Sequence, residues 1–183
     1  VRDLALVCES TGHYEEAVSY RQTLISHREL IDIIDVDLYL RSMHQQCCNY
    51  TNIGDSLQAF DCYTQTLTLY EQTYGKYSTK YATLLKAHLN FVRLKYKYID
   101  TEGIKDIYQD LIDVTQHLTG SNSSEEVCLL KVNLIRNVMM KELDSDHLGA
   151  TAAAKSSMEG EIEVLFTEVI TARTASLGAG HLL

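Results

Sequence analysis

A short sequence pattern occurs twice in this chain at a fixed interval, and this repetition limits the folds that the chain can adopt. Gly12–Ala17 and Gly54–Ala59 both run from a glycine to an alanine over the same spacing, and the two glycines lie 42 residues apart (54 − 12). Gly75 and Gly120 show a similar interval of 45 residues (120 − 75). Glycine allows a tight turn between two helices, and the small alanine allows the second helix to approach the first closely. The repetition therefore predicts consecutive helical hairpins that cover one another's apolar faces.

The segments between these glycines favour helices. The chain has no proline and only 9 glycines among 183 residues, so residues that interrupt helices are scarce. Apolar residues recur at intervals of three and four, as in Tyr81, Leu84, Leu85 and Leu89, which is the period of an amphipathic helix. We therefore expect an all-α protein. The expected helices span residues 2–11, 14–29, 35–52, 55–74, 78–98, 103–119, 124–143 and 160–177.

Stacked hairpins of this kind form an α-solenoid, and about four of them fit into the chain. We expect one array over residues 1–183, with repeats at approximately 1–33, 34–75, 76–120 and 121–183. The connection at 144–159 is longer than the usual few residues and contains glycine, alanine and serine. We expect a mobile insertion there.

Composition and charge exclude several classes of function. The formal net charge is −9, which repels the phosphate backbone of nucleic acids, so we expect no nucleic-acid partner. No apolar run is long enough to cross a bilayer, and no membrane association is expected. The odd number of cysteines and the absence of a Cys-x-x-Cys pair argue against a disulfide framework or a zinc ribbon and favour the cytoplasm. The cysteines are Cys8, Cys47, Cys48, Cys62 and Cys128.

The last segment, residues 161–183, resembles the second helix and the following loop of the roughly 42-residue tetratricopeptide-type repeats of kinesin light chains. The residues that match that repeat are Leu165, Val169, Ile170, Arg173, Leu177, Gly178 and His181. Leu182 stands where the family repeat has proline, and the usual alanines are missing. The resemblance implies a right-handed superhelix of tetratricopeptide-like repeats, in which the first helix of each hairpin lines a concave groove that binds peptides or helices of partner proteins.

One helix carries a polar stripe that fits such a groove. Lys86, Asn90, Arg93 and Lys97 are spaced so that they lie along one side of the expected helix 78–98. In an acidic chain these residues are suited to bind carboxylates of an acidic peptide. The alternative, an ordinary solvated helix face, stays open. In the preceding repeat, spacing from Gly54 places Arg41, His44, Cys48 and Thr51 on the corresponding inner surface.

Metal binding and catalysis are not expected. His44, Cys47 and Cys48 share one side of a helix, but no fourth ligand lies nearby in the sequence, and Cys47 occupies a position for a small packing residue. No nucleophile and base occur in a recognisable motif, and no phosphate-binding glycine loop is present. Most of the twelve tyrosines, including Tyr20, Tyr63 and Tyr108, fall at positions expected to pack in the core.

The sequence therefore predicts a protein-interaction scaffold or adaptor without an enzymatic activity or cofactor. It would bind other proteins as part of a larger complex. Two alternatives stay open: a structural subunit of a cytoskeletal or ciliary assembly, and a peptide-sensing regulatory domain of a larger protein.

Overall fold

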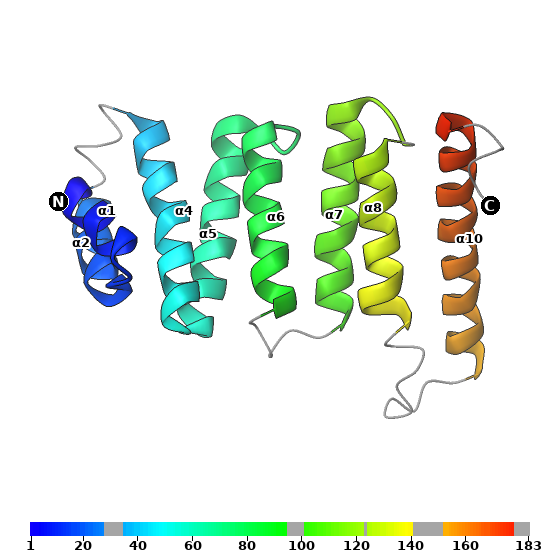
Figure 1. The fold of residues 1–183 in the computed structure, drawn as a ribbon, viewed down its shortest axis with the longest axis horizontal. Coiled ribbons are helices and arrows are strands. Elements are labelled where there is room, and N and C mark those ends of the chain that lie inside the picture. The colour runs from blue at the N-terminus through cyan, green and yellow to red at the C-terminus, as the bar shows by residue number, and fades with distance from the viewer. Residues whose placement is uncertain (28–34, 95–100, 123, 141–151, 178–183) are drawn as a thin grey trace. The chain divides into compact units, whose positions relative to one another are not determined.

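A computed structural model describes residues 1–27, 35–94, 101–122, 124–140 and 152–177. Over these residues the protein is made of helices joined by turns and contains no strand (Figure 1). The all-α prediction is thus confirmed for the part of the chain that the structure describes. The helices form two compact units, an N-terminal unit of Val1–Tyr98 and a C-terminal unit of Ile99–Leu183.

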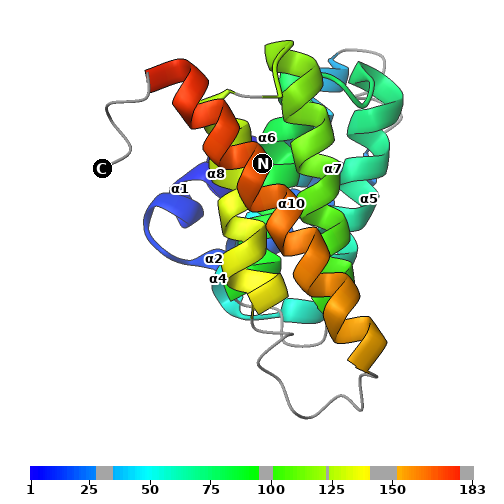
Figure 2. The same ribbon diagram turned by 90° about the vertical axis from the view of Figure 1, so that its right-hand side faces the viewer.

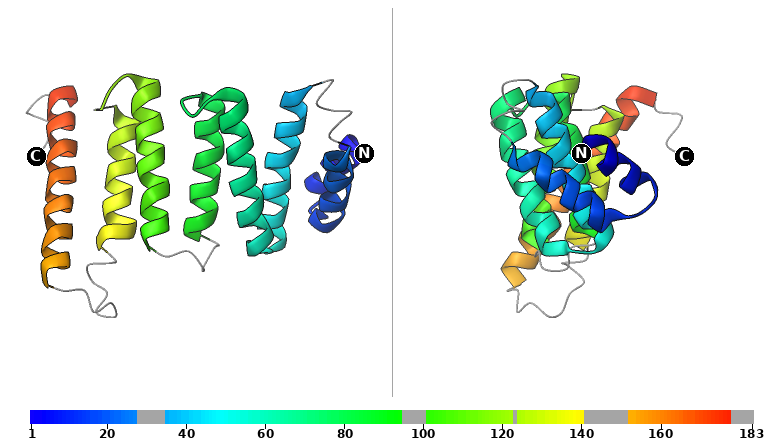
Figure 3. Two further views of the ribbon diagram at one scale, coloured as in Figure 1. Left: turned by 180° about the vertical axis from the view of Figure 1, so that it is seen from behind. Right: turned by 90° about the vertical axis from the view of Figure 1, so that its left-hand side faces the viewer.

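Over its described residues the N-terminal unit contains five helices, each close to its predicted span. They are α1 (Arg2–Ser10), α2 (Tyr14–Ser26), α4 (Val36–Ile53), α5 (Ser56–Tyr74) and α6 (Thr79–Leu94). Helices that follow one another in the sequence pack against each other: α1 on α2, α2 on α4, α4 on α5 and α5 on α6. From behind, Figure 3 shows α4, α5 and α6 running side by side.

The turn between α4 and α5 shows why the sequence pattern begins with glycine. Gly54 has a φ of +88°, in the left-handed region that residues with a side chain rarely adopt. Asp55 follows and accepts a hydrogen bond from the backbone N–H of Gln58, which caps the start of α5. The two alanines at the ends of the repeated pattern, Ala17 and Ala59, are fully buried, as close packing of the hairpins requires.

The core of the N-terminal unit is rich in aromatic side chains. The Tyr63 ring lies at a centroid distance of 5.4 Å from both His88 and Phe91 of α6. Tyr63 is buried, as predicted, and Tyr20 is half-buried. Both ring nitrogens of the buried His88 are without a hydrogen-bond partner among the described residues.

In the described part of the C-terminal unit, the elements are α7 (Thr101–Thr119), α8 (Glu125–Leu134), a π-helical segment η1 (Ile135–Met139) and α10 (Ala152–Leu177). Helix α7 packs on α8, and α10 packs on α8 and η1 (Figure 2). Cys128 of α8 meets Val169 and Ala172 of α10 in a small apolar cluster. Tyr108 of α7 is fully buried, as predicted.

The sequence prediction was wrong about the start of the last helix. Residues 152–159, expected to belong to a mobile insertion, form the first turns of α10. The physical reason is the helix propensity of alanine, which occupies positions 152–154. Residues 144–151 of the expected insertion lie outside the described residues. The predicted helix 124–143 also differs in detail, because it changes from α to π geometry at Ile135.

Candidate protein-binding surface

A hollow of about 290 Å³ lies on the N-terminal unit where α4, α5 and α6 meet. Helix α4 contributes residues spaced by four and three positions, which places them on one side of the helix. Helix α5 contributes two tyrosines near its C-terminal end, and α6 contributes residues of its first turns. The lining residues are Asp37, Arg41, His44, Tyr70, Tyr74, Lys80 and Thr83.

An ion pair joins α4 to α6 at one end of this hollow. The Lys80 ammonium lies 2.7 Å and 3.0 Å from the two carboxylate oxygens of Asp37, and the Tyr74 hydroxyl donates a hydrogen bond to the same carboxylate. Lys80 also lies 4.1 Å from the centre of the Tyr74 ring, a cation–π arrangement. The hydrogen bond from Lys80 lowers the pKa of Asp37, and the same contact raises the pKa of Lys80. Both residues are therefore charged over the physiological pH range.

Arg41 is the cation of the hollow that is not neutralised in this way. Its side chain is exposed, and among the described residues its guanidinium makes one hydrogen bond, from Nε to the backbone carbonyl of Asp37 at 3.3 Å. No carboxylate of the described residues forms an ion pair with it. The remaining donors of this guanidinium are therefore available to an incoming acceptor.

The other lining groups are neutral at physiological pH. Burial lowers the pKa of His44 below its ordinary value, so the imidazole is uncharged. Burial also raises the pKa of Tyr70 to about 12, which keeps its hydroxyl protonated. The hollow thus combines one exposed cation, one neutralised ion pair, an imidazole and two phenol rings.

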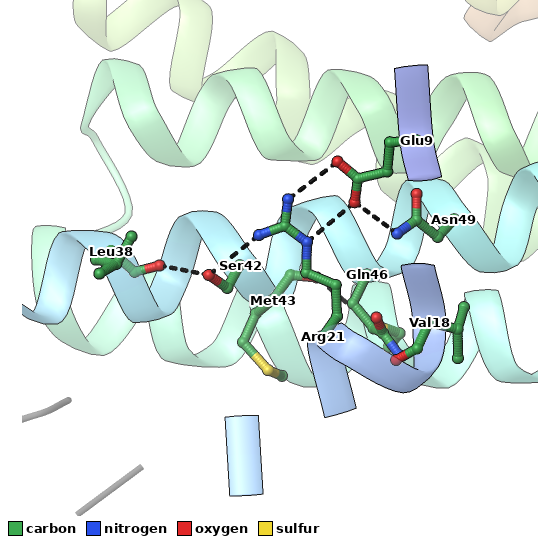
Figure 4. Close-up of polar contacts among 9 residues, drawn as sticks. Glu9, Val18, Arg21, Leu38, Ser42, Met43, Gln46 and Asn49 are labelled. Atoms are coloured by element: carbon green, nitrogen blue, oxygen red, sulfur yellow. Dashed lines mark hydrogen bonds and ion pairs between the residues drawn. The ribbon is translucent and has the colours of Figure 1, made fainter. Parts of the chain in front are cut away.

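A second hollow, of about 250 Å³, adjoins the first and is formed by α1, α2 and α4. Arg41 borders both hollows. Arg2 of α1 also lines the second hollow, together with Arg21 of α2. Arg21 differs from Arg41 because it binds the Glu9 carboxylate at 2.9 Å and 3.0 Å (Figure 4) and is buried. Arg21 is therefore already paired, whereas Arg41 has no ion pair among the residues that the structure describes.

The structure distributes the site residues predicted from sequence over several locations. Arg41 and His44 line the first hollow. Thr51 lies further along α4, and its hydroxyl donates to the Cys47 carbonyl at 2.9 Å. On α6, Lys86 is half-buried and both Asn90 and Arg93 are exposed, but none of these three lines either hollow. Lys97 lies outside the described residues.

Sequence reasoning missed the residues that complete the hollow, namely Asp37, Tyr70, Tyr74, Lys80 and Thr83. The spacing of Asp37, Arg41 and His44 at i, i+4 and i+7 was available as a signal. Tyr70 and Tyr74 are likewise spaced at i and i+4. Lys80 lies six residues before Lys86, and six helical steps turn the side chain by about 240°, onto a different side of α6.

The cysteines near His44 are engaged in packing contacts. The Cys47 thiol donates to the Met43 carbonyl at 3.2 Å, and the Cys48 sulfur lies 3.8 Å from the Tyr63 hydroxyl. Burial raises the pKa of both thiols, which disfavours the thiolate that a metal would need. Over the described residues, no three His, Cys, Asp or Glu side chains are grouped so that they could hold a metal ion.

Comparison with known proteins does not identify a family for this chain. In the described parts of the chain, no helix has the length and apolar character needed to cross a membrane. No protein-family model matches the sequence, and no curated protein is found to be similar to it.

Proposed function

We propose that the N-terminal unit is a protein-interaction module that binds an acidic peptide segment of a partner in the hollow around Arg41. The observation that carries the proposal is the exposed guanidinium of Arg41, which has no ion pair among the described residues. A carboxylate is the natural acceptor for a planar guanidinium with unused donors. The formal charge of −9 makes this local cation distinctive within the chain.

The surroundings of Arg41 favour a peptide over an isolated anion. The half-buried Tyr74 ring provides aromatic surface for a peptide side chain. The exposed Thr83 hydroxyl donates to the Thr79 carbonyl and keeps its lone pairs for backbone N–H groups of a peptide. The second hollow adjoins the first at Arg41 and has Arg2 at its edge. A peptide longer than one residue therefore has surface on both sides of the central guanidinium.

The proposed architecture is an α-solenoid of tetratricopeptide-like hairpins, acting as an adaptor without catalytic activity. Its support is the repeated glycine-to-alanine pattern at 12–17 and 54–59, together with the positive φ of Gly12 and Gly54 and the burial of Ala17 and Ala59. In such an array the first helix of each hairpin lines the groove, and α4 supplies Asp37, Arg41 and His44 to the hollow.

An array of short peptides of varied sequence tests the proposal with the full chain. Bound peptides are expected to be enriched in aspartate and glutamate, and Arg41→Glu is expected to weaken their binding at least tenfold, or about 1.4 kcal/mol. Arg136→Glu makes the same change of charge on an exposed residue of the C-terminal unit and serves as the matched control. Arg93→Glu reports on the stripe predicted from sequence. If Arg41→Glu and Arg136→Glu weaken peptide binding equally, the loss of affinity is due to the net charge of the chain, and the proposal is wrong.

A further inference from the structure

The C-terminal unit contains a larger hollow, of about 510 Å³, that is independent of the proposed peptide-binding surface. It is bounded by Gln116 of α7, Asn122 of the following turn, Lys131 of α8 and one side of α10 between Thr167 and Ala175. Its volume lies within the range of about 300–1,000 Å³ that is typical of small-molecule sites. The volume does not indicate which ligand would bind, but the charged groups of the hollow indicate its chemical class.

Lys131 is a buried cation at the wall of this hollow. Its side chain is only 7% exposed, and its ammonium lies 2.6 Å from one carboxylate oxygen of Glu168 on α10. An ammonium group has three donors, and Glu168 is the one partner that Lys131 has among the described residues. Because burial of an unpaired charge is costly, Lys131 needs a carboxylate or another anion beside it at all times.

Glu168 is placed very differently from its partner. Its side chain is 50% exposed, so Glu168 can reach water by a side-chain rotation. If Glu168 turns outward it regains hydration, whereas Lys131 has no such option. The pair can therefore be broken at small cost only when another anion takes the place of Glu168 on the ammonium.

We propose that this hollow binds a monocarboxylate ligand, whose carboxylate displaces Glu168 from Lys131. One buried ammonium compensates one negative charge, and the nearby Glu168 disfavours a second, so a dianion such as phosphate is a poor fit. The side-chain amides of Gln116 and Asn122 and the hydroxyls of Thr167 and Thr171 line the space beyond the ammonium. The small side chains of Ala172 and Ala175 leave room for the body of the ligand.

Nuclear magnetic resonance of the full chain tests this site, with sodium hexanoate as the probe. Hexan-1-ol is the neutral counterpart, and sodium chloride at matched concentration controls for ionic strength. Hexanoate is expected to shift the backbone amide signals of Thr171, Ala172 and Ala175, and hexan-1-ol is not. Equal shifts with the alcohol, or no shifts at these residues, would overturn the proposal without any variant.

Two substitutions separate the roles of the pair. Glu168→Gln removes the internal competitor, so hexanoate is expected to bind at least fivefold more tightly than it binds the parent. Lys131→Met removes the ammonium but keeps an apolar side chain, and it is expected to abolish the hexanoate shifts, while Glu168 returns to water. If Lys131→Met binds hexanoate as the parent does, or if Glu168→Gln binds it no more tightly, the exchange of carboxylates is wrong.

Thermal unfolding keeps the test decisive if Glu168→Gln is unstable. This variant leaves Lys131 unpaired, and its melting temperature is expected to fall by about 5 °C and to be restored by hexanoate but not by chloride. Failure of hexanoate to restore the melting temperature contradicts the proposal.

The source of the carboxylate is distinguished by comparing hexanoate with N-acetyl-alanyl-alanine. Tighter binding of hexanoate than of the dipeptide indicates that the ligand is a free organic acid. Tighter binding of the dipeptide than of hexanoate, together with weaker binding of the same dipeptide carrying a C-terminal amide, indicates that the ligand is the C-terminus of a polypeptide.

Discussion

Glu9 of α1 and Arg21 of α2 form a two-point ion pair that is almost completely withdrawn from water (Figure 4). The side chains are 10% and 5% exposed, and Asn49 of α4 donates a third hydrogen bond to the Glu9 carboxylate at 2.8 Å. The pair therefore ties the first hairpin to the helix that carries Arg41. Its geometry sets the relative position of the helices around the second hollow.

Removing one partner of this pair is expected to destabilise the protein strongly. Arg21→Met leaves Glu9 as a buried charge without its counter-ion, and the free energy of unfolding should fall by about 3–5 kcal/mol. Urea denaturation followed by circular dichroism measures this change. Asp3→Asn disrupts the exposed Arg2–Asp3 pair, whose side chains are 55% and 85% exposed, and is expected to cost less than about 1 kcal/mol. Similar losses for the two variants would show that the Glu9–Arg21 pair is not effectively buried.

His88 is expected to make the protein less stable in mild acid. Burial lowers the pKa of this imidazole from 6.5 to about 4, and neither ring nitrogen has a hydrogen-bond partner in the part of the chain that the structure describes. Above pH 6.5 the folded and unfolded states are both neutral at this residue, so it contributes no pH dependence. Between pH 6.5 and 4 only the unfolded state binds the proton, and the free energy of unfolding should fall by about 1.4 kcal/mol per pH unit.

The variant His88→Phe isolates this contribution. Phenylalanine does not titrate and suits the aromatic contacts with Phe60 and Tyr63. Denaturation at a series of pH values should therefore show a shallower loss of stability for His88→Phe than for the parent. His27→Gln, a change at an exposed histidine, serves as the matched control. An unchanged slope for His88→Phe would mean that His88 takes up a proton in the folded state.

Ala59 is expected to tolerate no larger side chain. It is fully buried where α4 and α5 pack, so Ala59→Leu should force the helices apart and reduce the free energy of unfolding by about 1–3 kcal/mol. Thermal unfolding measures the effect. Gln58→Leu introduces the same side chain at the neighbouring exposed position and should have little effect. A neutral Ala59→Leu would indicate that the crossing of the two helices is wider than the structure shows.

Asp37 is expected to weaken the binding of acidic peptides, because it neutralises Lys80. Asp37→Asn frees the Lys80 ammonium within the same hollow as Arg41, so peptides selected on the array should bind several-fold more tightly. Fluorescence anisotropy at increasing salt should show a steeper salt dependence for this variant. Adding Lys80→Gln should return the affinity towards that of the parent. If Asp37→Asn weakens binding, the acidic character proposed for the peptide is wrong.

The positions of the helices could be predicted from the sequence because they depend on local chemistry. The 3.6-residue period of apolar side chains identifies the face that each helix buries, and it places α4, α5 and α7 within a few residues of their observed spans. Glycine at position 54 and the small side chain of Ala59 are likewise required by the backbone and by the close approach of neighbouring helices. The exception is α10, where the helix propensity of the alanines at 152–154 extends the helix further than the composition of the connection suggested.

The binding surface depends on which exposed residues of different helices come together, and only the tertiary structure decides this. The sequence of α6 does not distinguish Lys80 from Lys86, since both are lysines of one amphipathic helix. In the structure, Lys80 lies against Asp37 of α4 and Lys86 lies on another side of the helix. The same holds for Lys131 and Glu168, which are 37 residues apart and contact each other because α10 packs on α8. A helical period specifies the angle of a side chain around its own axis. The neighbour that this side chain meets is specified by the packing of helices distant in the sequence.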